Sequence, residues 1–424
     1  MVKESLDLVR FPTAVCNDGS AGAYYIAEAH ARGGVAAAPR VWLIFLQGGG
    51  WCWDEASCAA RYSNERGLMS SDGFPPTRNA SGIFTRDPAF SPFASANKVY
   101  IPYCSSDAFV GSVAKGARRG GGAAGWHFRG QDLVAATLQA LRTRARKPLD
   151  KGHQVYFGGC SAGARGALFN LEYLPDMLPV GVSVYGLIDS ALWVDMEPAA
   201  AGAVSFRAQT QGVLDMANAS GRLGAECARR YGAAADRWKC LFGEYRLPLV
   251  RGPVLLSASQ YDSFQLLSNI GSGPPYIGGQ LAFAELFRRR TAALMQDLNG
   301  TAAVFGPACY GHCITEGSLF WTREVAARAG GHVVGNVSLA DVVDEWVRGH
   351  GDTLQAVEAC SGFDCGCCSA VTCDRCNASR FRRVAEIPPS GGSVCSLAKE
   401  GLRGTDPTSS PLSNAGGSME DVVV

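Results

Sequence analysis

One pentapeptide in the chain has the residue types of a serine nucleophile. Gly159-Cys160-Ser161-Ala162-Gly163 matches the G-x-S-x-G pattern, in which a serine stands on a tight strand-to-helix turn. An apolar run, residues 155–158, precedes it, and a helix-like stretch, residues 164–174, follows it. The small flanking residues let the backbone bend and expose the hydroxyl. We therefore predict that Ser161 is a nucleophile.

Two other interpretations of this pentapeptide stay open. It is an ordinary tight turn, or Cys160 supplies a thiol nucleophile in place of the serine. A residue at the position of Cys160 directs its side chain inward in such a turn, which favours Ser161.

A serine hydroxyl is too weak an acid to attack an ester unaided, so it needs a histidine base that a carboxylate orients. In the fold typical of this turn, the chain order is serine, acid, histidine. Only His312, His332 and His350 lie late enough, and only His312 closely follows a strand-like run. His332 and His350 occupy helical or polar stretches typical of surface histidines. We predict His312 as the base; the alternative is a structural histidine held between neighbouring cysteines.

Two aspartates compete for the role of the acid. Asp262 directly follows the apolar run 254–259, and Asp189 ends the run 182–188. A strand-end aspartate is more often a helix cap or a turn residue than a catalytic one. The chain order and the spacing of one strand before the histidine favour Asp262.

The oxyanion formed during ester hydrolysis needs backbone N–H donors. Ala162, directly after the serine, is expected to supply one. Gly49 and Gly50 lie in a glycine run after the apolar segment 41–46 and are expected to supply the others. A glycine run can instead cradle a phosphate, but no P-loop Lys-Ser/Thr and no GxGxxG continuing into a helix accompanies this one.

The elements that must position these residues form a repeating pattern. Short apolar runs rich in β-branched residues alternate with helix-like stretches, which predicts an α/β fold like that of α/β-hydrolases. Its sheet is expected to be mainly parallel, with helices on both faces. A period of three to four over residues 131–146 predicts an amphipathic crossover helix. We expect strands at residues 41–46, 99–102, 155–158, 182–188, 254–259 and 302–305.

A length of 424 residues fits one principal esterase domain, residues 1–350, because α/β enzymes often carry insertions. Segments 51–97 and 190–251 exceed normal loop length and are candidate insertions over the active site. We expect a Cys-rich extension at residues 351–380 and a disordered tail at 381–424.

Sixteen cysteines predict disulfide bonds and an oxidising compartment; zinc binding by the cysteines at residues 365–376 is the alternative. The net charge of +1 gives no field that would attract nucleic acid. No stretch approaches the roughly 20 apolar residues of a membrane span. The N-terminus has no apolar signal segment, so we expect the signal peptide to be missing from this chain.

Five Asn-x-Ser/Thr sequons also indicate the secretory pathway, because they are several times more frequent than chance predicts. The candidate glycosylation sites are Asn79, Asn218, Asn299, Asn336 and Asn377.

A set of motifs in one order, over roughly residues 15–320, resembles the pectin acetylesterase and Notum carboxylesterase family. Most of them look closer to the pectin acetylesterase branch, while Cys104-Ser105-Ser106-Asp107 looks closer to Notum. The sequence departs from both at Gln47, where a glutamate is usual, and at Ala164-Arg165, where plant members tend to have a second glycine. The landmarks are Cys16-Asn17-Asp18-Gly19-Ser20, Gly48-Gly49-Gly50-Trp51-Cys52, Ile101-Pro102-Tyr103-Cys104, Trp126-His127-Phe128-Arg129-Gly130, Gly159-Cys160-Ser161-Ala162-Gly163, Tyr261-Asp262-Ser263 and Cys309-Tyr310-Gly311-His312-Cys313.

The resemblance implies a secreted, disulfide-bonded esterase with the triad Ser161, Asp262 and His312, and we expect neither metal nor other cofactor. Its two branches imply two substrates: an O-acetylated, pectin-like polysaccharide, which we favour, or a palmitoleoylated protein. A catalytically silent ligand-binding module is a third interpretation, against which the complete candidate triad argues.

Overall fold

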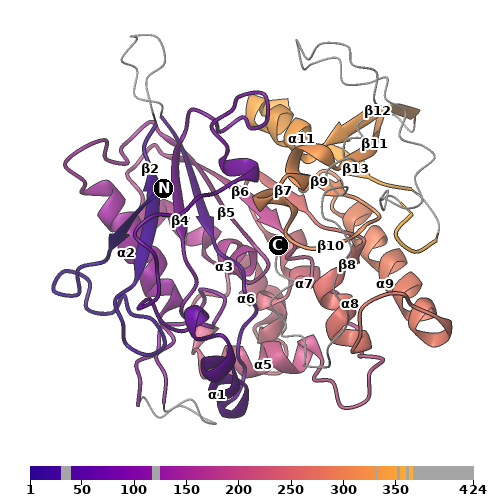
Figure 1. The fold of residues 1–424 in the computed structure, drawn as a ribbon, viewed down its shortest axis with the longest axis horizontal. Helices are drawn as coiled ribbons and strands as arrows, with labels where there is room; N and C mark the ends of the chain where they lie inside the picture. The colour runs from indigo at the N-terminus through magenta and orange to yellow at the C-terminus, as the bar shows by residue number, and fades with distance from the viewer. Residues whose placement is uncertain (30–39, 117–124, 330–331, 351–353, 360–361, 366–424) are drawn as a thin grey trace, which may run out of the picture.

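A nine-stranded sheet crosses the molecule in the computed structural model, which describes residues 1–29, 40–116, 125–329, 332–350, 354–359 and 362–365 (Figure 1). The strands from β4 to the β13 edge are parallel to one another, and β1 and β2 form an antiparallel edge. The order across the sheet is β1 (Val2–Ser5), β2 (Ala23–Ala27), β4 (Asn97–Ile101), β3 (Val41–Leu46), β5 (Gln154–Cys160), β6 (Ser183–Asp189), β7 (Val254–Ser257), β9 (Ala303–Gly306) and β13 (Gln355–Val357).

Alternate residues of each central strand enter different cores, because successive side chains point to opposite faces of a sheet. In β3, Trp42, Ile44 and Leu46 belong to one hydrophobic cluster, and Leu43 and Phe45 belong to another. Helices contribute buried side chains to both clusters, so the predicted α/β fold with helices on both faces is confirmed. The first cluster includes residues of α2 (Gly130–Arg142) and α3 (Ala162–Asn170), and the second includes residues of α11 (Leu339–Glu345).

The two long segments between strands carry helices of their own. Residues 51–97 contain α1 (Glu55–Asn64), and residues 190–251 contain α5 (Phe206–Met216), α6 (Ala225–Tyr231) and α7 (Gly243–Arg246). The other elements are α4 (Leu174–Met177), α8 (Ser263–Ile270), the 20-residue helix α9 (Gly278–Asp297), α10 (Leu319–Thr322), β8 (Tyr261–Asp262) with β10 (Tyr310–Gly311), and β11 (Glu324–Ala329) with β12 (His332–Ser338).

The structure differs from the sequence-based expectation at both ends of the sheet. The edge strands β1 and β2 were not predicted, because their short runs do not follow the parallel β–α alternation. Strand β13 pairs with β9, so the sheet extends past residue 350 into the segment expected to be a separate Cys-rich extension. The crossover helix α2 ends at Arg142, four residues before the predicted end at residue 146. Beyond it, Lys147, which precedes Pro148, has a positive φ of 46°. The predicted tail, residues 381–424, lies outside the described residues.

Disulfide bonds are present as predicted. Cys309 and Cys365 are also disulfide-bonded, which removes Cys365 from the candidate zinc ligands, whose other members lie outside the described residues. The four bonds with both partners described are Cys16–Cys104, Cys52–Cys58, Cys160–Cys313 and Cys227–Cys240.

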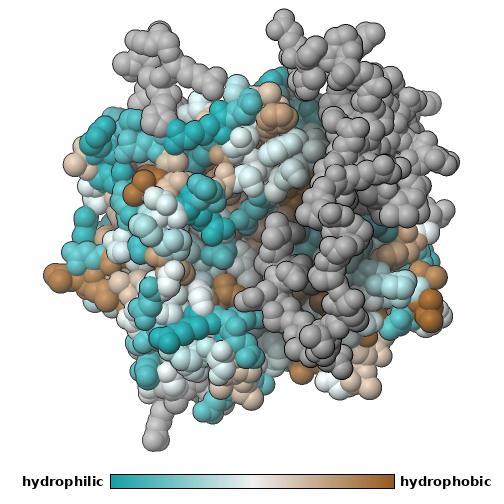
Figure 2. All heavy atoms as spheres, viewed as in Figure 1, coloured by the Kyte–Doolittle hydropathy of each residue, from teal (hydrophilic) through white to brown (hydrophobic). Residues whose placement is uncertain are grey.

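The surface in Figure 2 mixes hydrophilic and hydrophobic residues. Within the described part of the chain, no helix combines the length and the apolar character that crossing a bilayer requires.

Candidate active site

Ser161 occupies the turn between β5 and α3, as the G-x-S-x-G pattern predicts. Its backbone has φ 55° and ψ −121°, a conformation that non-glycine residues rarely adopt. Such strain is retained where the surrounding structure fixes it, and it clusters at functional sites. The residue is 3% exposed, so Ser161 is buried in the substrate-free structure.

The two glycines of the pentapeptide are required by close packing. A Cβ on Gly159 would lie 2.4 Å from the carbonyl carbon of Gly163, and a Cβ on Gly163 would lie 2.1 Å from the carbonyl oxygen of Leu46. Helix α3 therefore begins directly against the end of strand β3. This packing brings the glycine run after β3 next to Ser161, since a Cβ on Gly48 would lie 3.1 Å from the Ser161 Cβ.

Asp262 and His312 meet through the small parallel sheet of β8 and β10. In this sheet Gly311 pairs with Asp262, which places His312 one residue beyond the aspartate. The His312 Nδ1 lies 2.7 Å from Asp262 Oδ2. Because an ionised carboxylate only accepts hydrogen bonds, Nδ1 carries the proton and Nε2 is left as the acceptor nitrogen of the neutral ring.

The same carboxylate also begins a helix. Asp262 Oδ1 accepts a hydrogen bond from the backbone N–H of Gln265 at 2.9 Å and caps α8. Asp262 therefore caps helix α8 with one carboxylate oxygen and contacts His312 with the other. Fixed by the cap, the carboxylate has little freedom to turn away from His312.

The electrostatic surroundings raise the pKa of His312 above its ordinary value of 6.5. Burial lowers this pKa, but the charge and hydrogen bond of Asp262, with the charge of Asp189, outweigh burial; Arg165 acts in the opposite direction. Within the described residues, His312 Nε2 is buried and has no hydrogen-bond partner. It therefore makes no hydrogen bond to Ser161 Oγ in this structure. In substrate-free enzymes this contact is often long and tightens when substrate binds.

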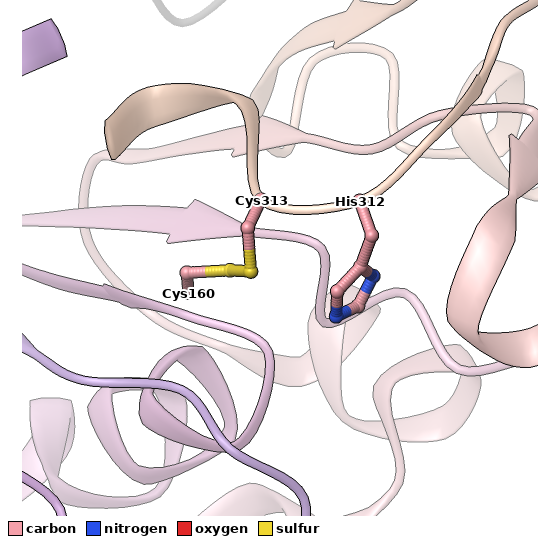
Figure 3. A group of neighbouring side chains, drawn as sticks. All are labelled: Cys160, His312 and Cys313. Atoms are coloured by element: carbon pink, nitrogen blue, oxygen red, sulfur yellow. A yellow bond between two sulfur atoms is a disulfide. The ribbon is translucent and has the colours of Figure 1, made fainter. Parts of the chain in front are cut away.

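A disulfide joins the neighbours of Ser161 and His312. Cys160 precedes the serine, Cys313 follows the histidine, and their sulfur atoms are bonded beside the imidazole ring (Figure 3). The sulfurs and a His312 nitrogen lie within 4.8 Å of one another. Because both sulfurs are in the disulfide, this group has no thiolate for a metal ion, and Cys160 has no thiol to act as a nucleophile.

Asp189, the competing candidate for the acid, binds the loop after His312 through hydrogen bonds. Its Oδ2 accepts hydrogen bonds from Thr315 N at 2.9 Å and Thr315 Oγ1 at 2.6 Å. Its Oδ1 accepts from Ser190 Oγ, which in turn accepts from the N–H of Cys313. Burial raises the pKa of Asp189. These contacts of Asp189 could not be predicted from the sequence, because Ser190 and Thr315 lie in different loops.

The glycine run beside Ser161 has backbone conformations that residues with a Cβ rarely adopt. Gly49 has φ 135° and Gly50 has φ 63°, values that favour glycine. The Gly49 carbonyl accepts a hydrogen bond from Arg61 Nη2, and Arg61 Nε donates to Ser106 Oγ at 2.9 Å. In the described part of the structure the N–H groups of Gly49 and Gly50 donate no hydrogen bond. Ala162 begins α3, where N–H groups have no intrahelical acceptor.

Gln47, one of the positions where the sequence departs from the family pattern, accepts a hydrogen bond through its side chain. Its Oε1 accepts from the backbone N–H of Tyr103 at 3.0 Å and ties the end of β3 to the end of β4. A neutral amide oxygen suffices for this contact.

The remaining predicted residues lie away from this site. His332 begins strand β12 rather than a helix, and His350 ends the short helical segment after α11. Of the sequon asparagines, Asn79, Asn299 and Asn336 are exposed and Asn218 is half-buried, whereas Asn377 lies outside the described residues.

Comparisons of sequence and structure relate the chain to known proteins. The chain is 30% identical to a palmitoleoyl-protein carboxylesterase of the Notum type from Xenopus laevis, over 75% of this chain and 63% of that protein. It is 27% identical to pectin acetylesterase 5 of Arabidopsis thaliana, over 78% of this chain and 77% of that protein. The crystal structure of the Wnt deacylase Notum from Drosophila superposes with a TM-score of 0.72 and 25% identity, over 86% of this chain and 98% of that one.

The chain thus spans under two thirds of the length of the Xenopus relative. The model of the pectinacetylesterase family matches residues 3–373, which include every element of the site. The chain belongs to the pectinacetylesterase family.

Proposed function

We propose that the protein hydrolyses carboxylic esters with Ser161 as nucleophile, His312 as general base and Asp262 as the residue that orients the histidine. The observation that carries this proposal is the 2.7 Å contact from Asp262 to His312 Nδ1 beside a strained serine turn. Family membership supports the same reaction class, because both branches are named for ester hydrolysis.

The reaction proceeds in two halves. Ser161 Oγ attacks the ester carbonyl while His312 Nε2 accepts its proton, and the tetrahedral intermediate then expels the alcohol, which takes that proton. A water molecule then loses a proton to the same nitrogen and attacks the acyl-serine. The second intermediate breaks its bond to Ser161 Oγ, which takes the proton back, and the carboxylic acid is released. The N–H groups of Gly49, Gly50 and Ala162 stabilise the oxyanion in both halves.

The favoured substrate is an O-acetylated, pectin-like polysaccharide, since the family model carries the name pectinacetylesterase. The second candidate is a palmitoleoylated protein, supported by the 30% identity to the Notum relative. Burying a long acyl chain needs a deep apolar pocket, because each buried methylene contributes about 0.8 kcal/mol. The disulfide bonds support secretion, since such bonds persist in oxidising compartments.

The decisive experiment replaces the nucleophile. Ser161→Ala should lower kcat for p-nitrophenyl acetate by more than about a thousandfold while circular dichroism shows an unchanged fold. Ser63→Ala, at an exposed serine on α1, is the matched control and should keep full activity. A fluorophosphonate probe should label the unchanged protein and not Ser161→Ala. Undiminished turnover by Ser161→Ala would exclude the mechanism, and an unlabelled wild-type protein would favour the silent binding module.

A further inference from the structure

A small aromatic pocket adjoins the nucleophile. Its volume is about 10 Å³, which is room for roughly one water molecule. Residues from five separate parts of the chain line it: Gly50, Trp51, Ala162, Arg165, Trp193, Phe206 and Phe264. Gly50 and Ala162 are two of the three candidate oxyanion donors, so an acyl group bound to Ser161 would border this pocket.

The aromatic walls continue up to the catalytic histidine. The Trp193 ring packs on Phe206 at a centroid distance of 4.9 Å and on Phe264 at 5.6 Å. Phe264 stacks on the His312 ring at 5.4 Å. Trp51 is fixed by a hydrogen bond from its Nε1 to Gln209 Oε1 at 3.0 Å. The walls are therefore rigid and apolar, which suits the hydrocarbon part of an acyl chain.

The guanidinium of Arg165 lies between two of these walls. Its central carbon is 3.7 Å from the centroid of the Trp51 ring and 3.7 Å from that of Trp193. The residue is 6% exposed, and its Nε and Nη2 have no hydrogen-bond partner in the described structure. A buried arginine is normally paired with a carboxylate. Here the faces of two tryptophans take that place, an arrangement that attracts a cation most strongly when water is excluded.

The backbone beneath Arg165 cannot move to enlarge the pocket. Arg165 belongs to α3, and its N–H donates to the Ser161 carbonyl at 3.0 Å. The next residue, Gly166, packs so closely that a Cβ there would lie 2.6 Å from the Ala108 carbonyl oxygen. Space for a longer acyl chain would therefore require the Arg165 side chain to leave both tryptophans.

We infer that Arg165 is a specificity-determining residue whose guanidinium fills the acyl pocket between Trp51 and Trp193 and restricts the enzyme to acetyl and similarly short acyl esters. This inference rests on the proposed esterase function and deepens it, because it selects the short-chain substrate class over a palmitoleoylated protein. An alanine at this position would leave an aromatic-walled hole where the guanidinium now lies.

The test is the dependence of kcat/KM on acyl length, measured with p-nitrophenyl esters from acetate to dodecanoate. The wild-type enzyme should prefer acetate and lose activity steeply beyond butyrate. Arg165→Ala should raise kcat/KM for octanoate relative to acetate by at least about tenfold, since each methylene newly buried in an apolar pocket is worth about a fourfold gain.

Two matched variants separate volume from charge. Arg165→Met keeps most of the bulk without the charge and should retain the preference for acetate. Arg222→Ala removes another arginine that stacks on an aromatic ring, Tyr173 at 5.2 Å, and that also has a buried nitrogen without a partner in the described residues. It does not line the pocket and should leave the profile unchanged. Because the Arg165 charge lowers the pKa of His312, both Arg165 variants should move the acidic limb of the pH profile to higher pH.

Several results would overturn the inference. Wild-type hydrolysis of octanoate or dodecanoate as efficient as that of acetate would show that the pocket is not closed, even if Arg165→Ala fails to fold. An unchanged profile in Arg165→Ala, or the same gain in Arg165→Met, would show that the volume of this side chain does not set the limit. In each of these outcomes the wild-type protein still hydrolyses esters. Failure of the proposed function would instead appear as an inactive wild-type protein or an active Ser161→Ala variant.

Discussion

Cys160 and Cys313 form a disulfide that joins the residue before Ser161 to the residue after His312. The bond spans a sequence separation of 153 residues and sits directly beside the imidazole. It therefore restrains the distance between the two loops that carry the proposed nucleophile and the proposed base, independently of the hydrogen bonds around them.

Removal of this disulfide should lower both stability and turnover. The double variant Cys160→Ala/Cys313→Ala loses a crosslink over a long loop, a class of change that typically costs about 2–5 kcal/mol of unfolding free energy. We expect kcat/KM for p-nitrophenyl acetate to fall as well, because the histidine loop gains freedom. Guanidinium denaturation and steady-state kinetics measure the two effects.

The matched control is Cys227→Ala/Cys240→Ala, which removes a disulfide of separation 13 in the long segment before β7. It should lower stability and leave kcat/KM nearly unchanged. Equal kcat/KM in both double variants would mean that the Cys160–Cys313 bond has no part in positioning the site.

The pH profile should report the raised pKa of His312. The base must be neutral to accept the serine proton, so kcat/KM should rise with pH and reach half its maximum above pH 6.5. Asp262→Asn removes the charge that raises this pKa, so the midpoint should move to lower pH, and kcat should fall by up to about ten-thousandfold because the tautomer is no longer fixed. A midpoint that stays in place in Asp262→Asn would assign the titration to another group.

The order of Ser161, Asp262 and His312 could be predicted from the sequence because each residue follows an apolar strand in an α/β pattern. The Cys160–Cys313 pairing could not be predicted, since spacing does not fix connectivity among sixteen cysteines. The closed pocket could not be predicted either. Its walls come from distant segments, and only the packing of residues 190–251 brings Trp193 against Arg165. Strands β1, β2 and β13 were not predicted, because β1 and β13 are only four and three residues long and β2 lies outside the parallel β–α alternation.

Arg61 should act as a positioning residue for the oxyanion loop. It holds the Gly49 carbonyl and the Ser106 hydroxyl, and its side chain is largely buried. Arg61→Met should lower kcat for p-nitrophenyl acetate by about tenfold with little change in KM, because loosened N–H donors stabilise the transition state less than fixed ones.

The control for Arg61 is Glu65→Gln. Glu65 pairs with Arg61 Nη1 at 2.7 Å but does not touch the glycine loop. It should change kcat less than twofold, because the hydrogen bonds from Arg61 to the Gly49 carbonyl and to Ser106 Oγ remain. A KM effect without a kcat effect in Arg61→Met would point to substrate binding instead of oxyanion positioning.

Asp189 should prove to be a tether of the histidine loop and not the triad acid. Asp189→Asn replaces one carboxylate oxygen by an NH2 group that cannot accept, so either Thr315 or Ser190 loses its acceptor, and we expect a loss of about 1–3 kcal/mol of unfolding free energy. The Asp189 charge also raises the pKa of His312, so its removal should shift the acidic limb of kcat/KM to lower pH.

The direction of that shift is the opposite of the one expected for the Arg165 variants, which makes the pair a test of the electrostatics around His312. Asp107→Asn is the control, because Asp107 is equally buried and accepts from the N–H groups of Phe109, Gly111 and Gly130. It should destabilise the fold without moving the acidic limb. If Asp189→Asn instead lost activity as completely as Asp262→Asn at every pH, Asp189 would share the catalytic role, because a tether that acts only through Thr315 and Ser190 leaves the Asp262–His312 contact in place.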